Sequence, residues 1–279
     1  MSKTVSDIFF KVWEIGSYVA LITFVIHILS ALTLDRHIEY RRVTYTSEKI
    51  SPSLDGYLIA FITDSHSIST ERLSQVIERL NGYDLDLLLL GGDFHLRDRD
   101  DLDPIMEVLS KTQTNDGIFG VEGNHDFHLT LFASMRKFGI TPLSNNGYGV
   151  REGLHVGGVE DMWNRTPKVG LAVADAQPDD FVLLVSHNPE IVMKQYTGNV
   201  DLILSGHTHG GHITLFGLWA PALHPFFTIT EYGHRFKTGL IEFEDRADVL
   251  VSNGIWTYNH IPRIFARPQV ILLTLTHGQ

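Results

Sequence analysis

The sequence predicts a mixed α/β domain that follows an N-terminal membrane helix. Residues 15–34 form a run without Asp, Glu, Lys or Arg. From Gly56 onward, short apolar segments alternate with segments of helical periodicity, which is the pattern of strands connected by helical crossovers. Hydrophobic residues make up 43% of the 279 residues, so a full core is expected. We expect an anchor over 1–34, a connector over 35–55 and a domain over 56–279.

The apolar run at 15–34 is long enough to cross a bilayer. At about 1.5 Å per residue, a helix of this length spans about 30 Å, the thickness of the hydrocarbon core. A buried core helix is less favoured, because the run precedes the first strand and a polar connector follows it. A cleaved signal peptide is also less favoured, because Asp7 and Glu14 occupy the basic region that such peptides need and no clear A-x-A site follows.

Basic residues on either side of this run indicate its orientation. Cytoplasmic flanks carry more Lys and Arg than external flanks. The flanking cations are Lys3 and Lys11 before the run, and Arg36, Arg41, Arg42 and Lys49 after it. By a margin of two charges, this count favours a single-pass protein of the cell membrane whose C-terminal domain is cytoplasmic.

The domain itself contains eight strand candidates. Several are continuously apolar, as strands covered on both faces must be. They cover residues 57–63, 85–90, 117–121, 155–159, 181–186, 201–206, 249–253 and 270–275. Between the first two, residues 70–80 place Leu73, Val76 and Leu80 on one stripe of a helix, with Ser69 or Thr70 as its N-cap.

The composition of the chain limits the partners and the metal ligands that the protein can use. The net charge is −11, with 33 acidic against 22 basic residues, and nucleic-acid binding normally needs a basic face. We therefore expect no nucleic-acid partner. Cysteine is absent, whereas histidine occurs 15 times. Many imidazoles without thiols point to a metal site built from nitrogen and oxygen ligands.

Five of the apolar segments end in metal-ligating residue types. Parallel sheets bind ligands just beyond the carboxyl ends of their strands, so these residues are expected to share one rim. In extended backbone, residues two apart point the same way, which pairs Asp64 with His66 and His207 with His209. The five endings are Asp64-Ser65-His66, Gly92-Asp93, Gly123-Asn124-His125-Asp126, His187, and Gly206-His207-Thr208-His209. A preference for such residues in turns explains any one of these endings. It does not explain five of them in succession, each directly after a strand.

This order of motifs resembles the calcineurin-like metallophosphoesterase superfamily, and the resemblance runs from about residue 57 to 275. It implies a four-layer α/β/β/α sandwich with two divalent cations, Mn, Fe or Zn, between the strand ends. The implied metal ligands are Asp64, His66, Asp93, Asn124, His187, His207 and His209, with Asp93 bridging. The implied catalytic residues are His125, which faces the substrate as a proton or hydrogen-bond donor, and Asp126, which orients it.

The resemblance also implies hydrolysis of a phosphodiester or pyrophosphate by a metal-bridged hydroxide. The apolar N-terminus, the GHTHGG run and residues 263–268 resemble a membrane-anchored branch, in which some members cleave UDP-2,3-diacylglucosamine and others are general phosphodiesterases. A lipid-linked phosphate is therefore one expected substrate. The alternatives are a non-catalytic, membrane-tethered interaction module on the same fold and a nuclease.

Several further residues have two interpretations each. The apolar segment 213–229 either contacts the bilayer or, as we favour, packs on the core of the domain. Residues 160–165 are expected to line the substrate entrance. We expect His95 to be a solvated loop residue and not a substrate contact. For Arg165, Arg263 and Arg267, phosphate contact is possible but a surface position is favoured. His27, inside the apolar run, is assigned no role.

Overall fold

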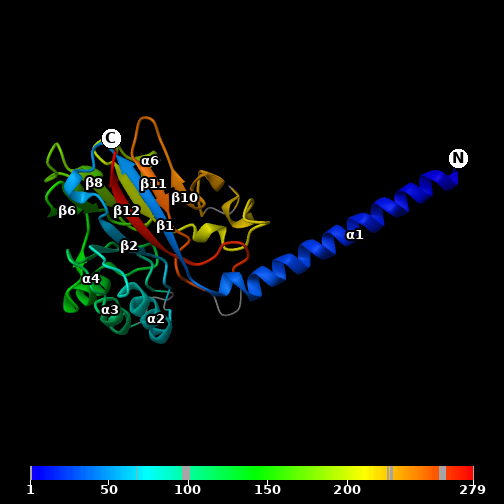
Figure 1. The fold of residues 1–279 in the computed structure, drawn as a ribbon, viewed down its shortest axis with the longest axis horizontal. Helices are drawn as coiled ribbons and strands as arrows, with labels where there is room; N and C mark the ends of the chain where they lie inside the picture. Colours follow the sequence, from blue (N-terminus) through cyan, green and yellow to red (C-terminus); the bar gives the residue numbers. More distant parts are fainter. Residues whose placement is uncertain are drawn as a thin grey trace.

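The computed structural model describes residues 2–66, 68–95, 101–224, 226, 229–257 and 262–278. Two six-stranded sheets pack face to face in the domain (Figure 1). The first, sheet A, consists, in spatial order, of β1 Glu39–Ser47, β12 Gln269–His277, β2 Leu58–Ile62, β3 Leu87–Leu90, β4 Ile118–Gly120 and β5 Thr141–Pro142. The second, sheet B, consists of β10 Gly239–Ile241, β11 Asp248–Val251, β9 Leu202–Ser205, β8 Phe181–Val185, β7 Leu154–Gly158 and β6 Asn146–Arg151.

Apolar side chains fill three interfaces and so define four layers. Between the sheets, residues such as Phe61, Leu89 and Leu204 form one fully buried cluster. A second cluster lies under the helices that cover sheet A, and a third lies outside sheet B. The helices are α2 Thr70–Leu80, α3 Asp103–Leu109 and α4 His128–Lys137 over sheet A, and the short α5 Val169–Ala172 and α6 Ile191–Lys194 on the other side. The expected α/β/β/α sandwich is confirmed.

All eight predicted strands are present, and the side chain of Ser69 caps α2 by accepting from the backbone N–H of Arg72. Four further strands, β1, β5, β6 and β10, were not predicted. The expected connector over 35–55 is therefore wrong in part, since Glu39–Ser47 pairs along its whole length with β12 in parallel (Figure 1). The polar residues of β1 alternate between half-buried and exposed positions, which is why its sequence has no apolar run.

Helix α1, Ser2–Leu32, leaves the domain (Figure 1) and carries many exposed large apolar side chains. Among the described helices it is the one long and apolar enough to cross a membrane, judged by length and composition. The domain contacts its C-terminal end. Ser30 and Asp35 are buried and bonded to each other, and Asp35 also accepts from the backbone N–H of Phe265.

The apolar segment 213–229 departs from the favoured prediction that it packs on the core. Leu218 is 79% exposed and Phe226 is 86% exposed, whereas Leu223 is buried. Pro225, Phe227 and Thr228 lie outside the described residues. The segment thus anchors itself through a few buried positions and leaves several large apolar side chains at the surface: Ile213, Leu215, Phe216, Leu218, Trp219 and Phe226.

Candidate metal centre

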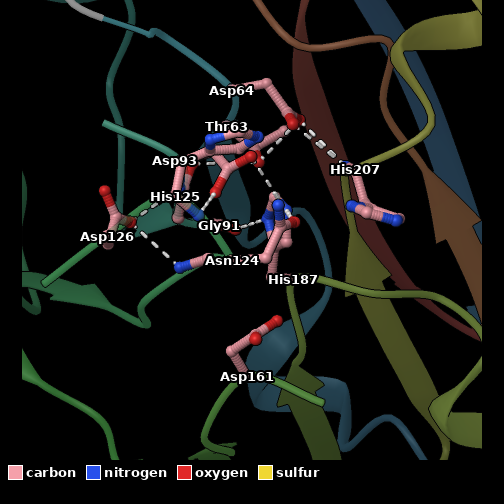
Figure 2. A network of polar contacts seen from close by, with 12 residues as sticks. Thr63, Asp64, Gly91, Asp93, Asn124, His125, Asp126, Asp161, His187 and His207 are labelled. Atoms are coloured by element: carbon pink, nitrogen blue, oxygen red, sulfur yellow. Dashed lines mark hydrogen bonds and ion pairs between the residues drawn. The ribbon is translucent and has the colours of Figure 1, made fainter. Parts of the chain in front are cut away.

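The carboxyl ends of five strands from both sheets meet at one rim, as the sequence analysis predicts. Strands β2, β3 and β4 of sheet A run parallel and deliver Asp64, His66, Asp93 and Asn124. Strands β8 and β9 of sheet B also run parallel and deliver His187, His207 and His209. Figure 2 shows Asp64, Asp93 and His187 gathered at the centre of a polar network.

The backbone is strained where it presents these side chains. Asp64, His66, Asp93, His207 and His209 all have positive φ, between 41° and 70°. Residues other than glycine avoid this left-handed region, so such positions cost free energy unless the surrounding fold imposes them. Five of the seven predicted ligands therefore occupy a conformation that favours function over local stability.

Two glycines allow this crowding. A Cβ on Gly123 would lie 2.2 Å from Oδ1 of Asp93, and one on Gly206 would lie 2.1 Å from Oδ2 of Asp64. Each of these glycines directly precedes a predicted ligand, Asn124 or His207. Glycine at these two positions lets the two carboxylates sit against the neighbouring backbone.

The ligand atoms form two groups that share Asp64. In the first, Asp64, His66 and His209 have ligand atoms within 4.8 Å of one another, and in the second so do Asp64, Asp93 and His187. Asp93 lies between the groups, with Oδ2 3.5 Å from Nε2 of His66 and 3.3 Å from Nε2 of His187. Two ligands of one ion, each about 2.0–2.2 Å from it, lie about 3–3.5 Å apart. The spacing of these atoms fits a pair of cations.

Hydrogen bonds fix which ring nitrogen of each histidine faces the centre. Nδ1 of His66 donates to the carbonyl of His95 (2.9 Å), and Nδ1 of His187 donates to the carbonyl of Gly91 (2.8 Å). The Nε2 atoms are then lone-pair donors in the neutral rings. Nε2 of His66 lies 3.3 Å from Nε2 of His209, and Nε2 of His187 lies 3.1 Å from Oδ1 of Asn124. When both rings are neutral with the proton on Nδ1, their Nε2 lone pairs would face these neighbouring atoms, an arrangement that a bound cation satisfies.

Burial and neighbouring charges shift the pKa values of the groups at the centre in opposite directions. Burial raises the pKa of Asp64. Burial acts in the same direction on Asp93, but the charges of His187 and His66 outweigh it and hold the pKa of Asp93 well below its usual value. Burial disfavours protonated His187, but Asp93 outweighs it and raises the pKa of His187 to about 10. Without a cation, a proton on His187 thus balances the carboxylates.

The other two histidines are held neutral. Burial, followed by the nearby charge of His187, lowers the pKa of His207 to about 3. Burial, followed by the charge of His66, also lowers the pKa of His209 well below its usual value. A metal ligand must be the neutral imidazole, so both rings are ready to bind at neutral pH. Nδ1 of His209 is buried, and among the described residues it has no hydrogen-bond partner.

Comparison with known proteins gives the same result as the geometry. Residues 57–211, more than half of the chain, match the sequence profile of the calcineurin-like phosphoesterases, and all seven predicted ligands lie in this range. The chain belongs to this family. The phosphoesterase is therefore a hydrolase that acts on phosphoric esters, and the sequence-based assignment is confirmed at that level.

Three relatives illustrate the similarity. A metallophosphoesterase of Aquifex aeolicus is 27% identical over 68% of this phosphoesterase and 72% of its own length. Metallophosphoesterase YkuE of Bacillus subtilis is 25% identical over 86% of this phosphoesterase and 88% of its own length. A "transmembrane protein with metallophosphoesterase domain" from Danio rerio is 24% identical over 82% of this chain, which spans 55% of that protein.

The phosphoesterase places His125 at the open side of the centre. Its side chain is exposed, and its ring centroid lies 5.1 Å from that of His66. Its backbone N–H donates to Oδ1 of Asp93 (2.9 Å), which ties the loop to the middle of the site. An exposed imidazole thus lies beside the largely buried predicted ligands.

Asp126 binds the backbone of the loop that carries Asp93. Its two carboxylate oxygens accept hydrogen bonds from the backbone of Asp93, Phe94, His95 and Gly123. One oxygen also contacts Nδ1 of His95 (3.1 Å). Both oxygens are thus committed to the loop that carries Asp93. Asp126 shapes this loop, and among the described residues its carboxylate has no hydrogen bond to the ring of His125, so an orienting role for Asp126 stays a prediction.

Two expectations are corrected by burial. His95 is 2% exposed, so it is not a solvated loop residue. Its ring pairs with Asp126 and its carbonyl fixes His66. Arg263 is 1% exposed and not a surface residue. It donates to the carbonyls of Trp256, His209 and Ala266, so it holds the backbone of a predicted ligand instead of contacting phosphate.

Loop 160–165 lies against the centre. The ring of Trp163 is 4.7 Å from that of His207, and Nδ2 of Asn164 donates to the backbone carbonyl of Asn124. Arg165 instead faces Glu122, with 3.9 Å between Nε and Oε1. Sequence reasoning missed Trp256, which packs against the rings of both His66 and His209. It belongs to no motif, so no sequence signal marks it.

Proposed function

We propose that this phosphoesterase is a membrane-anchored enzyme that hydrolyses a phosphodiester or pyrophosphate with two divalent cations at the rim. The observation that carries the proposal is the convergence of carboxylate, carboxamide and imidazole groups from five strand ends. These ligand types suit Mn, Fe or Zn. The proposed ligands are Asp64, His66, Asp93, Asn124, His187, His207 and His209.

The chemistry divides between the cations and the chain. Two such cations would lower the pKa of a shared water and offset the charge that builds on phosphate. The chain contributes position: carbonyls aim His66 and His187, and Asp126 shapes the loop that carries Asp93. His125, exposed at the rim, is the residue we assign to protonate the leaving oxygen.

Membrane anchoring is supported by helix α1 and by its contact with the apolar segment. The ring of His27 in α1 lies 4.6 Å from that of Phe216, and Nε2 of His27 accepts from the backbone N–H of Phe216 (3.4 Å). His27 is seven residues before Leu34, where the apolar run ends. If the end of the apolar run marks the edge of the hydrocarbon core, a rise of about 1.5 Å per residue would put Phe216 about 10 Å into the bilayer. The excess of basic residues after the apolar run supports a domain on the cytoplasmic side.

This arrangement favours a lipid-linked phosphate, such as UDP-diacylglucosamine, as substrate. The apolar segment begins at Ile213, directly after the turn that carries His209. A surface that enters the bilayer is thus joined by a few residues to a metal ligand. A substrate whose phosphate lies at the membrane surface would reach the rim without leaving the bilayer.

Turnover and metal content of the purified full-length chain test this function. We expect about two transition-metal ions per chain, and hydrolysis of bis-p-nitrophenyl phosphate that a chelator abolishes and added Mn restores. A panel with phosphomonoester, phosphodiester, UDP-sugar lipid and DNA then defines the substrate. Bound metal without turnover of any ester would support a non-catalytic module instead, and preference for DNA would support a nuclease. A reporter fused to the C-terminus assigns the side of the membrane.

A further inference from the structure

A pocket of about 680 Å³ lies at the foot of α1, and four arginines line it. Arg36 comes directly from the end of the membrane helix, Arg72 and Arg79 come from α2, and Arg267 comes from the segment before β12. The remaining wall includes the ring of Tyr40 and the carboxylate of Glu71. Cationic groups from three separate parts of the chain therefore face one space.

The charge of this pocket contrasts with the rest of the protein. The chain has a net charge of −11. The pocket has four guanidinium groups against the one carboxylate of Glu71. In the described part of the chain, arginine ion pairs involve Arg151, Arg165 and Arg246, so the four arginines of the pocket are not neutralised by acidic partners. An anion would supply the missing counter-charge.

Local contacts hold three of the guanidinium groups in place. Arg72 donates to the carbonyl of Arg36 (3.0 Å), Nε of Arg267 donates to the carbonyl of His37 (2.9 Å), and the guanidinium of Arg79 lies 4.0 Å from the ring centroid of Tyr40. Arginine has five N–H donors, so these contacts orient each group and leave donors for a ligand. Burial lowers the pKa of Arg72, which shows that its charge has lost part of its hydration.

The place of the pocket identifies the ligand. Arg36 is two residues beyond Leu34, the last residue of the apolar run, so the pocket lies at the level of lipid headgroups if α1 crosses the bilayer. Basic groups at this level attract the anionic lipids of the cytoplasmic leaflet. We infer that Arg36, Arg72, Arg79 and Arg267 bind the phosphate of an anionic lipid headgroup. The inference rests on the membrane anchoring in the proposed function.

A neighbouring pocket of about 450 Å³ links this site to the metal centre. It shares Arg36 and Arg72 with the first pocket and extends to Arg263, which donates to the carbonyl of His209. A lipid held by the four arginines would therefore lie beside the residue that positions a metal ligand. A lipid bound here would hold the domain against the bilayer beside Arg263, which contacts the backbone of a proposed metal ligand.

The test is native mass spectrometry of the full-length, metal-loaded chain in detergent with dioctanoyl phosphatidylglycerol or dioctanoyl phosphatidylcholine. We expect the wild type to retain phosphatidylglycerol, and Arg36→Gln/Arg79→Gln to retain it about tenfold less. Arg36→Lys/Arg79→Lys keeps the charge and should recover most of the binding. Arg136→Gln, at an exposed arginine of α4, is the matched control and should bind as the wild type does. A cleaved lipid would appear as a different mass.

Three results would overturn the inference: equal retention of the two lipids by the wild type, unchanged retention of phosphatidylglycerol by the Gln double variant, or inorganic phosphate displacing the lipid as well as free phosphatidylglycerol does. The last result would indicate a site for free anions. Turnover of bis-p-nitrophenyl phosphate is measured in parallel and should stay within about twofold in the Gln double variant, because no arginine of the pocket touches the proposed ligands. Loss of lipid binding with normal turnover separates this inference from the proposed function.

Discussion

The two sides of the metal centre differ in burial and in what holds them. On the inner side, Asp64, Asp93 and His187 are almost fully buried, and backbone carbonyls, N–H groups and glycines fix them. On the outer side, Asn124 is half-buried and His125 is exposed. The difference indicates a division of work: the inner side holds charge that must not move, and the outer side meets a substrate that must enter and leave.

The largest effect is expected from the inner side. Asp93→Asn removes the carboxylate that lies between both groups of ligands, so activity should fall by more than about 10⁴-fold, as for residues that act as one unit. Metal content, measured by inductively coupled plasma mass spectrometry, should fall as well. Asp179→Asn, at an exposed aspartate, is the control. Two bound ions and normal turnover in Asp93→Asn would contradict the division of work.

A change on the outer side should separate chemistry from metal binding. In His125→Gln, metal content should stay at the wild-type level while kcat falls about 10²–10³-fold, within the range of general acid catalysis. The fall should be smaller for a p-nitrophenyl ester than for an alkyl ester, because p-nitrophenolate leaves without a proton. An equal effect on both esters would show that His125 binds the substrate and does not donate a proton.

Arg263 tests the support behind the inner side. Arg263→Gln loses donors to the carbonyls of Trp256, His209 and Ala266. We expect about 10–100-fold weaker metal binding, as for other residues that orient a ligand, and a lower Tm. Arg165→Gln, which removes a partly exposed guanidinium, should change neither property much. Unaltered metal affinity in Arg263→Gln would show that the backbone turn at His209 keeps its conformation without Arg263.

The smallest step, about tenfold in metal affinity for each pH unit, is expected from a change of pH. Asp93 raises the pKa of His187 to about 10 in the absence of cations, so the ring carries a proton throughout the neutral range. A cation must displace this proton, and metal affinity should therefore rise about tenfold per pH unit between pH 6 and 9. Metal titrations in weak buffer should show one proton released per chain from His187. Affinity that does not depend on pH would mean that the ring is already neutral.

Central strands could be predicted from the sequence, and edge strands could not. Strands such as β3, Leu87–Leu90, and β8, Phe181–Val185, are buried on both faces, so their sequences are continuously apolar. The four strands that were missed, β1, β5, β6 and β10, all lie at the edges of the two sheets. An edge strand is half-exposed and needs no apolar run, so its pairing depends on neighbours that are distant in sequence.

The same limit applies to the site. The predicted ligands stand directly after central strands, and parallel pairing brings those ends together, so Asp93 and His187 could be located from the sequence. The partners of Asp126 and Arg263 depend on the path of loops, and a carboxylate beside the loop of Asp93 serves backbone N–H groups as well as it would an imidazole. Trp256 reaches the centre from a loop with no sequence pattern at all.

Strand β1 makes the connection between helix α1 and the domain stiff. Nine consecutive residues that follow the anchor pair with the strand that ends the fold, and Asp35 bonds to the backbone at Phe265 just before that strand. A domain on a flexible linker can move in all directions on its side of the membrane and can reach soluble targets. If helix α1 crosses the membrane as proposed, strand β1 would instead keep the rim at a nearly constant height and tilt, and the enzyme would reach only targets that meet it by lateral diffusion in the plane of the bilayer.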